Sequence, residues 1–180
     1  INECLNKKIN NNFLINKASI NSKDIKKNNI FFGIKGKNID GNKFADEALK
    51  KKASICILEK NYSKKNSRKI FVKDTLKTFS NLSCIIRKSL GTPIVAITGS
   101  AGKTSLKELI GQSLNTLIPT SYSKKSFNNQ YGVPLSLFNI DKKHKIGVFE
   151  IGMDKKGEIH KLSNLIRPDI GVITNISYCL

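Results

Sequence analysis

Residues 94–110 read IVAITGSAGKTSLKELI, which places a turn of small residues between an apolar run and an amphipathic segment. The β-branched run at 94–98 predicts a buried strand. The apolar residues after the turn recur at helical spacing and predict one buried helix face, made of Leu106, Leu109, Ile110, Leu114 and Leu117. Backbone N–H groups at a strand-to-helix turn of this kind can surround phosphate oxygens. The stretch therefore predicts a phosphate-binding loop that opens a helix.

The side chains of this loop, TGSAGKTS at 98–105, suit a nucleotide and a magnesium ion. Lys103 can neutralise terminal phosphates, and the hydroxyl of Thr104 can coordinate Mg²⁺. We expect the nucleotide to contact the whole loop, which consists of Gly99, Ser100, Ala101, Gly102, Lys103, Thr104 and Ser105. The alternative is a glycine-rich turn whose lysine faces solvent. The common pattern G-x-x-x-x-G-K-[ST] requires a glycine where Ile97 stands, so the loop is damaged, a chance match or of another kind.

Glu150 is the candidate metal ligand. It ends the apolar run IGVFE at 146–150, so we expect it at the carboxyl edge of a parallel sheet, where ligands bind in such folds. Mg²⁺ prefers a few protein oxygens together with phosphate and water. We therefore assign Glu150, with Thr104, to the metal. The alternative is a surface glutamate at the end of a strand.

The run SFNNQYGVPLSLF at 126–138 carries two adjacent amides, Asn128 and Asn129, before a glycine and a proline. Paired amide donors and acceptors suit a polar, peptide-like or sugar-like ligand. An Asx turn ahead of a helix is the alternative. We assign no catalytic role to His144 or His160, because no serine or cysteine partner pattern surrounds them.

The order of apolar runs predicts an α/β protein with a small N-terminal α/β domain over 1–91. The first part of a doubly wound, mostly parallel-sheet, phosphate-loop ATPase domain follows over 92–180. Asp74 is expected to cap the helix that joins them. In the first domain we expect buried strands within 30–36, 54–60 and 69–72, and a helix with Phe44, Ala45, Ala48 and Leu49 on one face. In the second we expect further strands at 146–152 and 169–176, covered on both faces, with a helix around 159–166 between them.

Composition narrows the function classes. The net charge of +19 comes almost entirely from scattered lysines, with arginine only at Arg68, Arg87 and Arg167, so we do not expect a nucleic-acid partner. No apolar run is long enough to span a bilayer. The four dispersed cysteines predict reduced thiols and a cytoplasmic location.

Four motifs in this order resemble the Mur ligase family, namely TGSAGKTS, NNQYGVPLSLF, FEIGMDKKGEI and RPDIGVITNIS. The phosphate loop of that family has the form T-G-x-x-G-K-[ST], without the earlier glycine. The resemblance therefore implies an intact loop of another kind. The stretch IFFGIKGKNIDGNKF at 30–44 is similar to the family's N-terminal segment that helps hold the UDP part of the substrate. In that stretch the family usually has Asp-Gly-His where this chain has Asp40-Gly41-Asn42. Before it, the family has arginine where Lys23 follows Ser22 in this chain.

The resemblance implies an ATP- and Mg²⁺-dependent ligase of peptidoglycan precursor synthesis. Such an enzyme adds D-alanyl-D-alanine to UDP-N-acetylmuramoyl-tripeptide through an acyl phosphate, and we expect it to be a monomer. Lys103 and Glu150 would be catalytic. Ser22, Asn128 and Asn129 would contact the UDP-muramoyl-peptide substrate.

The family's second metal position, a histidine, falls on Leu180. The resemblance implies that the rest of the central domain and a third domain lie beyond it, so we expect this chain alone to be an inactive fragment. Two other classes stay open. One is a different phosphate-loop NTPase such as a small kinase, and the other is a non-catalytic module that binds nucleic acid, a nucleotide or the UDP substrate.

Overall fold

The computed structural model describes residues 13–59, 66–123 and 125–177. The chain divides into two compact units, residues 1–82 and 83–180, each with its own parallel sheet. The division falls inside the helix α3 (Thr75–Ser89). The domain boundary after Gly91 stays a prediction.

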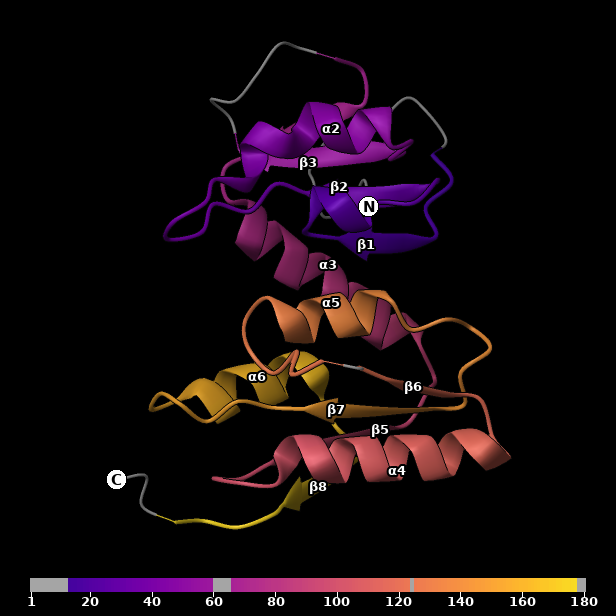
Figure 1. The fold of residues 1–180 in the computed structure, drawn as a ribbon, viewed down its shortest axis with the longest axis vertical. Helices are drawn as coiled ribbons and strands as arrows, with labels where there is room; N and C mark the ends of the chain where they lie inside the picture. The colour runs from indigo at the N-terminus through magenta and orange to yellow at the C-terminus, as the bar shows by residue number, and fades with distance from the viewer. Residues whose placement is uncertain (1–12, 60–65, 124, 178–180) are drawn as a thin grey trace. The chain divides into compact units, whose positions relative to one another are not determined.

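The first unit has a four-stranded parallel sheet in the order β1-β2-β3-β4 (Figure 1). Its strands are β1 (Lys17–Ser19), β2 (Asn29–Phe32), β3 (Ile55–Glu59) and β4 (Lys69–Val72). Its other elements are the 3-10 turns η1 (Ser22–Asp24) and η2 (Gly41–Phe44) and the helix α2 (Ala45–Lys50). The strands predicted within 30–36, 54–60 and 69–72 are confirmed.

Packing in this unit follows the predicted apolar faces with one exception. Ala45, Ala48 and Leu49 of α2 pack on Phe31 and on the inner side of β3. Phe44, which we predicted on the same face, is 39% exposed. The prediction is wrong because Phe44 belongs to η2, and α2 begins only at Ala45, so Phe44 does not share the helical periodicity.

The start of α3 is set by a side-chain cap. The Asp74 carboxylate accepts the Lys77 backbone N–H at 2.8 Å, which confirms the predicted N-cap. One turn later Phe79 packs against Phe32 of β2, with ring centroids 4.4 Å apart. The capped end of α3 is thereby anchored to the sheet of the first unit.

The second unit has a parallel sheet in the order β6-β7-β5-β8. Its strands are β5 (Ile94–Thr98), β6 (Thr120–Tyr122), β7 (Ile146–Glu150) and β8 (Ile170–Ile173). Its helices are α4 (Lys103–Leu117), α5 (Gly132–Phe138) and α6 (Glu158–Ile166). Helix α4 connects β5 to β6, at one edge of the sheet. Helices α5 and α6 then lead the chain back through β7 and past β5 to β8, at the other edge. Right-handed crossovers in opposite directions place helices on opposite faces of the sheet, as Figure 1 shows.

Alternation along β5 explains how this sheet is filled on both faces. Ile94 and Ala96 face a core that includes Val133 of α5 and Leu162 of α6. Val95 and Ile97 face the opposite core, to which α4 contributes Leu106, Ile110 and Leu114. The doubly wound arrangement predicted for this part is confirmed.

Three details of this unit differ from the sequence predictions. Leu109 and Leu117 are 64% and 81% exposed, because α4 contacts the sheet along the narrower stripe of Leu106, Ile110 and Leu114. Strand β8 is largely exposed rather than covered, since it lies at an edge of the described sheet. The three-residue strand β6 was not predicted, because a run as short as Thr-Ser-Tyr carries no periodicity.

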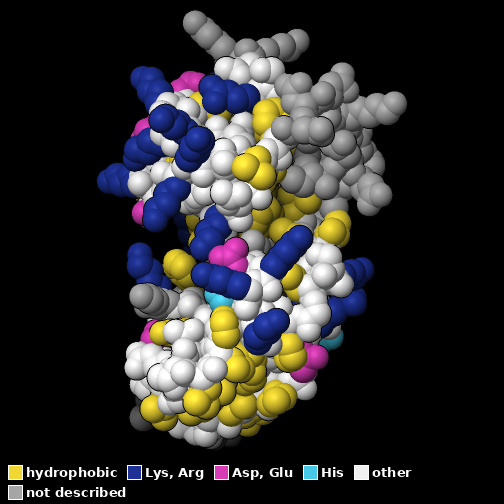
Figure 2. Space-filling model, turned by 90° about the vertical axis from the view of Figure 1, so that its right-hand side faces the viewer, with side chains coloured by type: hydrophobic (Ala, Val, Ile, Leu, Met, Phe, Trp, Pro, Cys, Tyr) yellow, Lys and Arg dark blue, Asp and Glu magenta, His cyan; other side chains and the backbone are white. Residues whose placement is uncertain are grey.

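The face of the molecule drawn in Figure 2 is not uniformly basic. In Figure 2 the lysine and arginine side chains are interspersed with neutral and apolar ones. At the foot of that view, where α4 and β8 lie, the visible surface is largely apolar. Within the described ranges, every helix is too short or too polar to cross a bilayer.

Burial makes Cys56 of β3 an unreactive thiol. It is fully buried, and burial raises its pKa to about 12, although Lys69 and Arg68 oppose the shift. At pH 8 roughly one thiol in ten thousand would be ionised, and the thiolate is the reactive form. A maleimide should therefore label the half-buried Cys84 in the folded protein and spare Cys56 until urea is added. Peptide mass mapping checks this. Equal labelling of both thiols without urea would contradict the packing of β3.

The same shift has a consequence for stability. The folded state holds the Cys56 proton more tightly than the unfolded state, whose pKa lies near 9.0. The associated stabilisation is present below about pH 9 and is lost as the pH rises toward 12.

Candidate functional site

Four loops of the second unit follow the carboxyl ends of its strands. Their described residues are 99–102 after β5, 123 and 125–131 after β6, 151–157 after β7 and 174–177 after β8. Because all four strands are parallel, these loops meet at one edge of the sheet. The phosphate loop, the asparagine pair and Glu150 all lie there.

Two glycines shape the phosphate loop. Gly99 has φ 139° and Gly102 has φ 78°, both in the region that favours glycine. Gly102 directly precedes α4, whose first backbone N–H groups have no partner within the helix and point along the helix axis toward the loop. The Lys103 ammonium donates to the Gly99 carbonyl at 2.5 Å, which closes the loop on itself. The geometry is therefore that of a cradle for an anion.

Glu150 lies directly against this cradle. The residue is 1% exposed, and its carboxylate accepts hydrogen bonds from the Thr104 hydroxyl at 2.8 Å and from the Asn128 amide at 2.8 Å. The Thr104 hydroxyl is also 3.3 Å from the Ser126 hydroxyl. Both hydrogen-bond donors are neutral, and no lysine or arginine of the described ranges forms an ion pair with Glu150. A cation beside this buried carboxylate would offset part of its desolvation.

The side-chain oxygen atoms of Thr104 and Glu150 suit Mg²⁺ as metal ligands. The Thr104 hydroxyl and the Glu150 carboxylate supply hard oxygen atoms, which this ion prefers, and they leave positions for phosphate and water. Across the described residues, no group of three or more histidine, cysteine, aspartate or glutamate side chains could hold a metal without such help.

The two asparagines predicted to face the substrate have different local roles. Asn129 is exposed, and its side-chain oxygen accepts the N–H groups of Tyr131 and Gly132 at 3.0 Å each, so it forms the Asx turn that opens α5. Asn128 donates through its amide nitrogen to Glu150. The structure thus brings Asn128 into contact with Glu150, whereas Asn129 is adjacent in the chain and caps α5.

Ser22 lies in the first unit. Its hydroxyl donates to the Glu47 carboxylate at 2.9 Å. Lys51 and then Ser22 lower the pKa of Glu47 by hydrogen bonding. Leu180, at the family's second metal position, lies outside the described residues.

The segment 174–177, which ends one of the four family motifs but was assigned no role at the site, is bound to the phosphate loop. Asn175 accepts the Ala101 N–H through its side chain at 2.9 Å and the Ser100 N–H through its carbonyl at 3.0 Å. The Thr174 hydroxyl donates to the Ala101 carbonyl at 2.6 Å. The argument from carboxyl edges could have found this segment, because TNIS directly follows β8.

This contact leads to a prediction for Gly99. A methyl group on Gly99 would overlap the Thr174 hydroxyl and lie 3.0 Å from backbone atoms of Asn175. Gly99→Ala should therefore lower the free energy of unfolding by about 1–3 kcal/mol, measured by urea titration, through this overlap together with the strain of an alanine at φ 139°. Gly102→Ala, which meets no neighbour but needs positive φ, should cost about 1 kcal/mol. Gly91→Ala in open space is the control, and an equal loss in all three variants would contradict the contact with 174–177.

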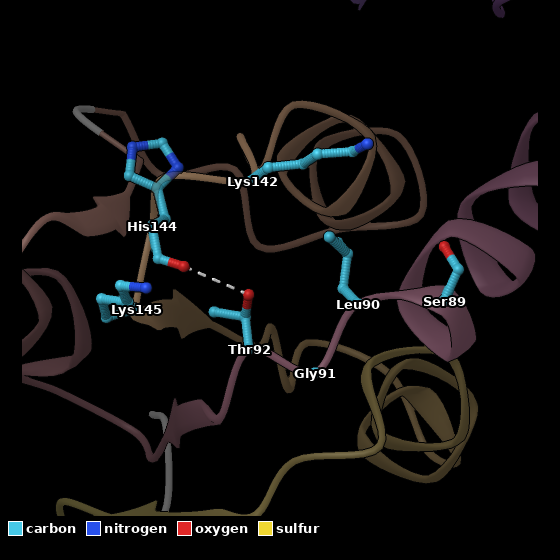
Figure 3. Close-up of a pocket in the computed structure, with 7 residues that line it drawn as sticks. All are labelled: Ser89, Leu90, Gly91, Thr92, Lys142, His144 and Lys145. Carbon is cyan, nitrogen blue, oxygen red and sulfur yellow. Dashed lines mark hydrogen bonds between the residues drawn. The ribbon is translucent and has the colours of Figure 1, made fainter.

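A hollow of about 570 Å³ lies elsewhere in the second unit, at the amino ends of β5 and β7. Figure 3 shows the Lys142 side chain extending toward Leu90, with the His144 ring and Lys145 on the other side of the hollow. The His144 carbonyl accepts the Thr92 hydroxyl at 3.3 Å, and its ring nitrogen accepts the Asp141 N–H at 2.9 Å. The cationic groups do not converge on one point, and the hollow lies at the edge opposite the phosphate loop.

Comparison with known sequences shows which proteins this chain is similar to. Residues 97–178 match the Mur ligase middle domain. The UDP-N-acetylmuramoyl-tripeptide–D-alanyl-D-alanine ligase of Buchnera aphidicola subsp. Acyrthosiphon pisum is 37% identical over 163 residues, which are 91% of this chain and 36% of the relative. The ligase of the same name from Bacillus subtilis is 32% identical over 165 residues, again 91% of this chain and 36% of the relative. The chain thus spans little more than a third of their length.

Solved structures agree with this. A crystal structure of MurF from Acinetobacter baumannii superposes with a TM-score of 0.79 at 28% identity, and the match covers 91% of this chain and 36% of that one. The structure of MurF ligase from Thermotoga maritima in complex with ADP superposes with a TM-score of 0.76 at 30% identity, and the match covers 92% and 38%. The α/β fold with its parallel sheets is shared with both.

Proposed function

We propose that this chain, which belongs to the Mur ligase family, carries the nucleotide-binding part and the UDP-substrate-binding part of an ATP-dependent ligase. The ligase joins D-alanyl-D-alanine to UDP-N-acetylmuramoyl-tripeptide in peptidoglycan precursor synthesis. The names of the relatives support the reaction. The observation that carries the proposal is the contact between Thr104 of the phosphate loop and the buried Glu150 carboxylate, at 2.8 Å.

The chemistry requires two anions to meet, because the γ-phosphate of ATP passes to the terminal carboxylate of the tripeptide. The amine of D-alanyl-D-alanine then displaces phosphate from the acyl phosphate. Loop residues 99–105 bind the phosphates, and the Lys103 ammonium exchanges the Gly99 carbonyl for a phosphate oxygen. Thr104 and Glu150 hold Mg²⁺, which neutralises charge on the phosphates when bound.

The substrate contacts are assigned within this proposal. Ser22 contacts the UDP part of the substrate, and Asn128 and Asn129 face its muramoyl-peptide part. The amide oxygen of Asn128 is the group best suited to this, because its nitrogen is held by Glu150. We place the protein in the cytoplasm, where its nucleotide substrates are found. We also propose that it is a monomer.

Two calorimetric titrations test the proposal, one with ATP in the presence and absence of Mg²⁺ and one with UDP-N-acetylmuramoyl-tripeptide. We expect both ligands to bind and Mg²⁺ to strengthen ATP binding. Binding of ATP alone would favour a different phosphate-loop NTPase, and binding of the UDP substrate alone would favour a non-catalytic module. Salt-sensitive retention on DNA, without either ligand binding, would contradict the proposal.

A further inference from the structure

Lys107 is a buried lysine on α4, and the proposed chemistry gives it no role. Its side chain is 0% exposed and lies one helical turn beyond the phosphate loop. Its ammonium is 3.1 Å from the carboxylate of Glu108, which is 29% exposed. Burying an ammonium costs free energy that one ion pair of this kind does not always repay. An apolar side chain of similar length would fill the same space without that cost.

The second contact of Lys107 is with the loop that follows β6. Its ammonium donates to the Lys125 carbonyl at 3.1 Å. The same carbonyl accepts the Ser123 hydroxyl at 2.7 Å and the Phe127 N–H at 2.7 Å. The bonds from Ser123 and Phe127 fix the turn of the loop itself, and the bond from Lys107 ties this turn to α4.

Directly after this point the loop contributes two side chains to the cluster around Glu150. Ser126 lies 3.3 Å from the Thr104 hydroxyl, and Asn128 donates to Glu150 at 2.8 Å. Thr104 and Lys107 are three residues apart on α4, so they lie on the same side of the helix. This side of α4 therefore contacts the loop at two points. Thr104, at the start of the helix, lies beside Ser126, and Lys107, one turn later, binds the Lys125 carbonyl.

We infer that Lys107 is a positioning residue for the metal site: its ammonium holds the loop at Lys125, so that Ser126 and Asn128 orient Thr104 and Glu150. The inference rests on the proposed function for its magnesium readout. It does not require Lys107 to touch the nucleotide. Ser126 and Asn128 are the outer partners of Thr104 and Glu150, and Lys107 acts through them. Removal of such outer partners lowers metal affinity by about 10–100-fold.

Lys107→Met separates positioning from stability. The Lys125 carbonyl keeps its contacts with Ser123 and Phe127, and Glu108 keeps water, so no buried polar group loses all its partners. We expect a melting temperature equal to or above that of the wild type. The enhancement of ATP affinity by Mg²⁺ should fall about 10–100-fold, while ATP affinity without Mg²⁺ stays unchanged. Lys125→Met is the matched control, because Lys125 contributes only its carbonyl, and it should behave like the wild type.

A second readout does not depend on nucleotide. By NMR, hydrogen exchange of the Asn128 side-chain amide and of the Phe127 N–H should be faster in Lys107→Met than in the wild type. If Lys107→Met does not fold, Ser123→Ala removes another donor to the same carbonyl and should shift both readouts in the same direction. Unchanged exchange, or a lower melting temperature with an intact magnesium effect, would overturn the inference. If the wild type binds no ATP, the proposed function fails, whereas the exchange measurement still decides the role of Lys107.

Discussion

Lys103→Ala should lower the affinity of the chain for ATP and for ADP while the affinity for adenosine stays the same. Charged hydrogen bonds contribute about 1.5–3 kcal/mol, which corresponds to about 10–150-fold in the dissociation constant. The ammonium lies within the phosphate loop, bound to the Gly99 carbonyl, so its loss removes positive charge where phosphate oxygens are expected. Calorimetry with the three ligands measures the effect.

The control for Lys103 is Lys155→Ala, which removes the same charge from an exposed loop of the same unit. It should leave all three affinities unchanged. Equal ATP affinity in Lys103→Ala and the wild type would remove the phosphate-loop assignment. An equal loss in both variants would show that net charge, rather than the loop, attracts the nucleotide.

Glu150→Gln should abolish the magnesium dependence of ATP binding without unfolding the protein. Glu150 is 1% exposed, and its carboxylate is contacted by the neutral donors of Thr104 and Asn128. Replacing it by an amide of the same shape removes a buried charge, so we expect stability to stay equal or to rise. The magnesium effect should fall by at least the roughly 10–100-fold that an outer partner of a metal ligand contributes.

Two measurements separate these effects of Glu150→Gln. Thermal unfolding reports stability, and titration of Mg²⁺ at fixed ATP reports the metal site. Glu59→Gln in β3 of the first unit is the control and should change neither. A magnesium effect that survives in Glu150→Gln would mean that the buried carboxylate is structural.

The parallel sheets and the meeting of site residues could be predicted because they depend on local patterns. The apolar runs at 94–98 and 146–150 predict strands whose carboxyl ends carry Thr98 and Glu150. Parallel strands place such residues at one edge, so Thr104 and Glu150 could be expected at the same edge. Their 2.8 Å contact depends further on β7 lying beside β5. The role of Asn129 as an Asx turn was also one of the alternatives read from sequence.

The contacts that depend on tertiary structure could not be predicted in the same way. Lysines are seldom fully buried, and the partner of Lys107 is a backbone carbonyl, which has no sequence signature. The pairing of 174–177 with the phosphate loop depends on β8 lying beside β5. Leu109 and Leu117 share the spacing of the buried residues on α4, and only the width of the helix–sheet contact decides that they are exposed.

The measurement that tests the account most directly is NMR of the chain with ADP and Mn²⁺ as a paramagnetic substitute for Mg²⁺. A metal held by Thr104 and Glu150 should broaden the signals of residues 102–105 and of Glu150 beyond detection. The signals of Thr92 and His144, at the opposite edge of the sheet, should stay sharp. Broadening centred on that opposite edge, or spread evenly over the lysine-rich surface, would contradict a magnesium–nucleotide site at the phosphate loop.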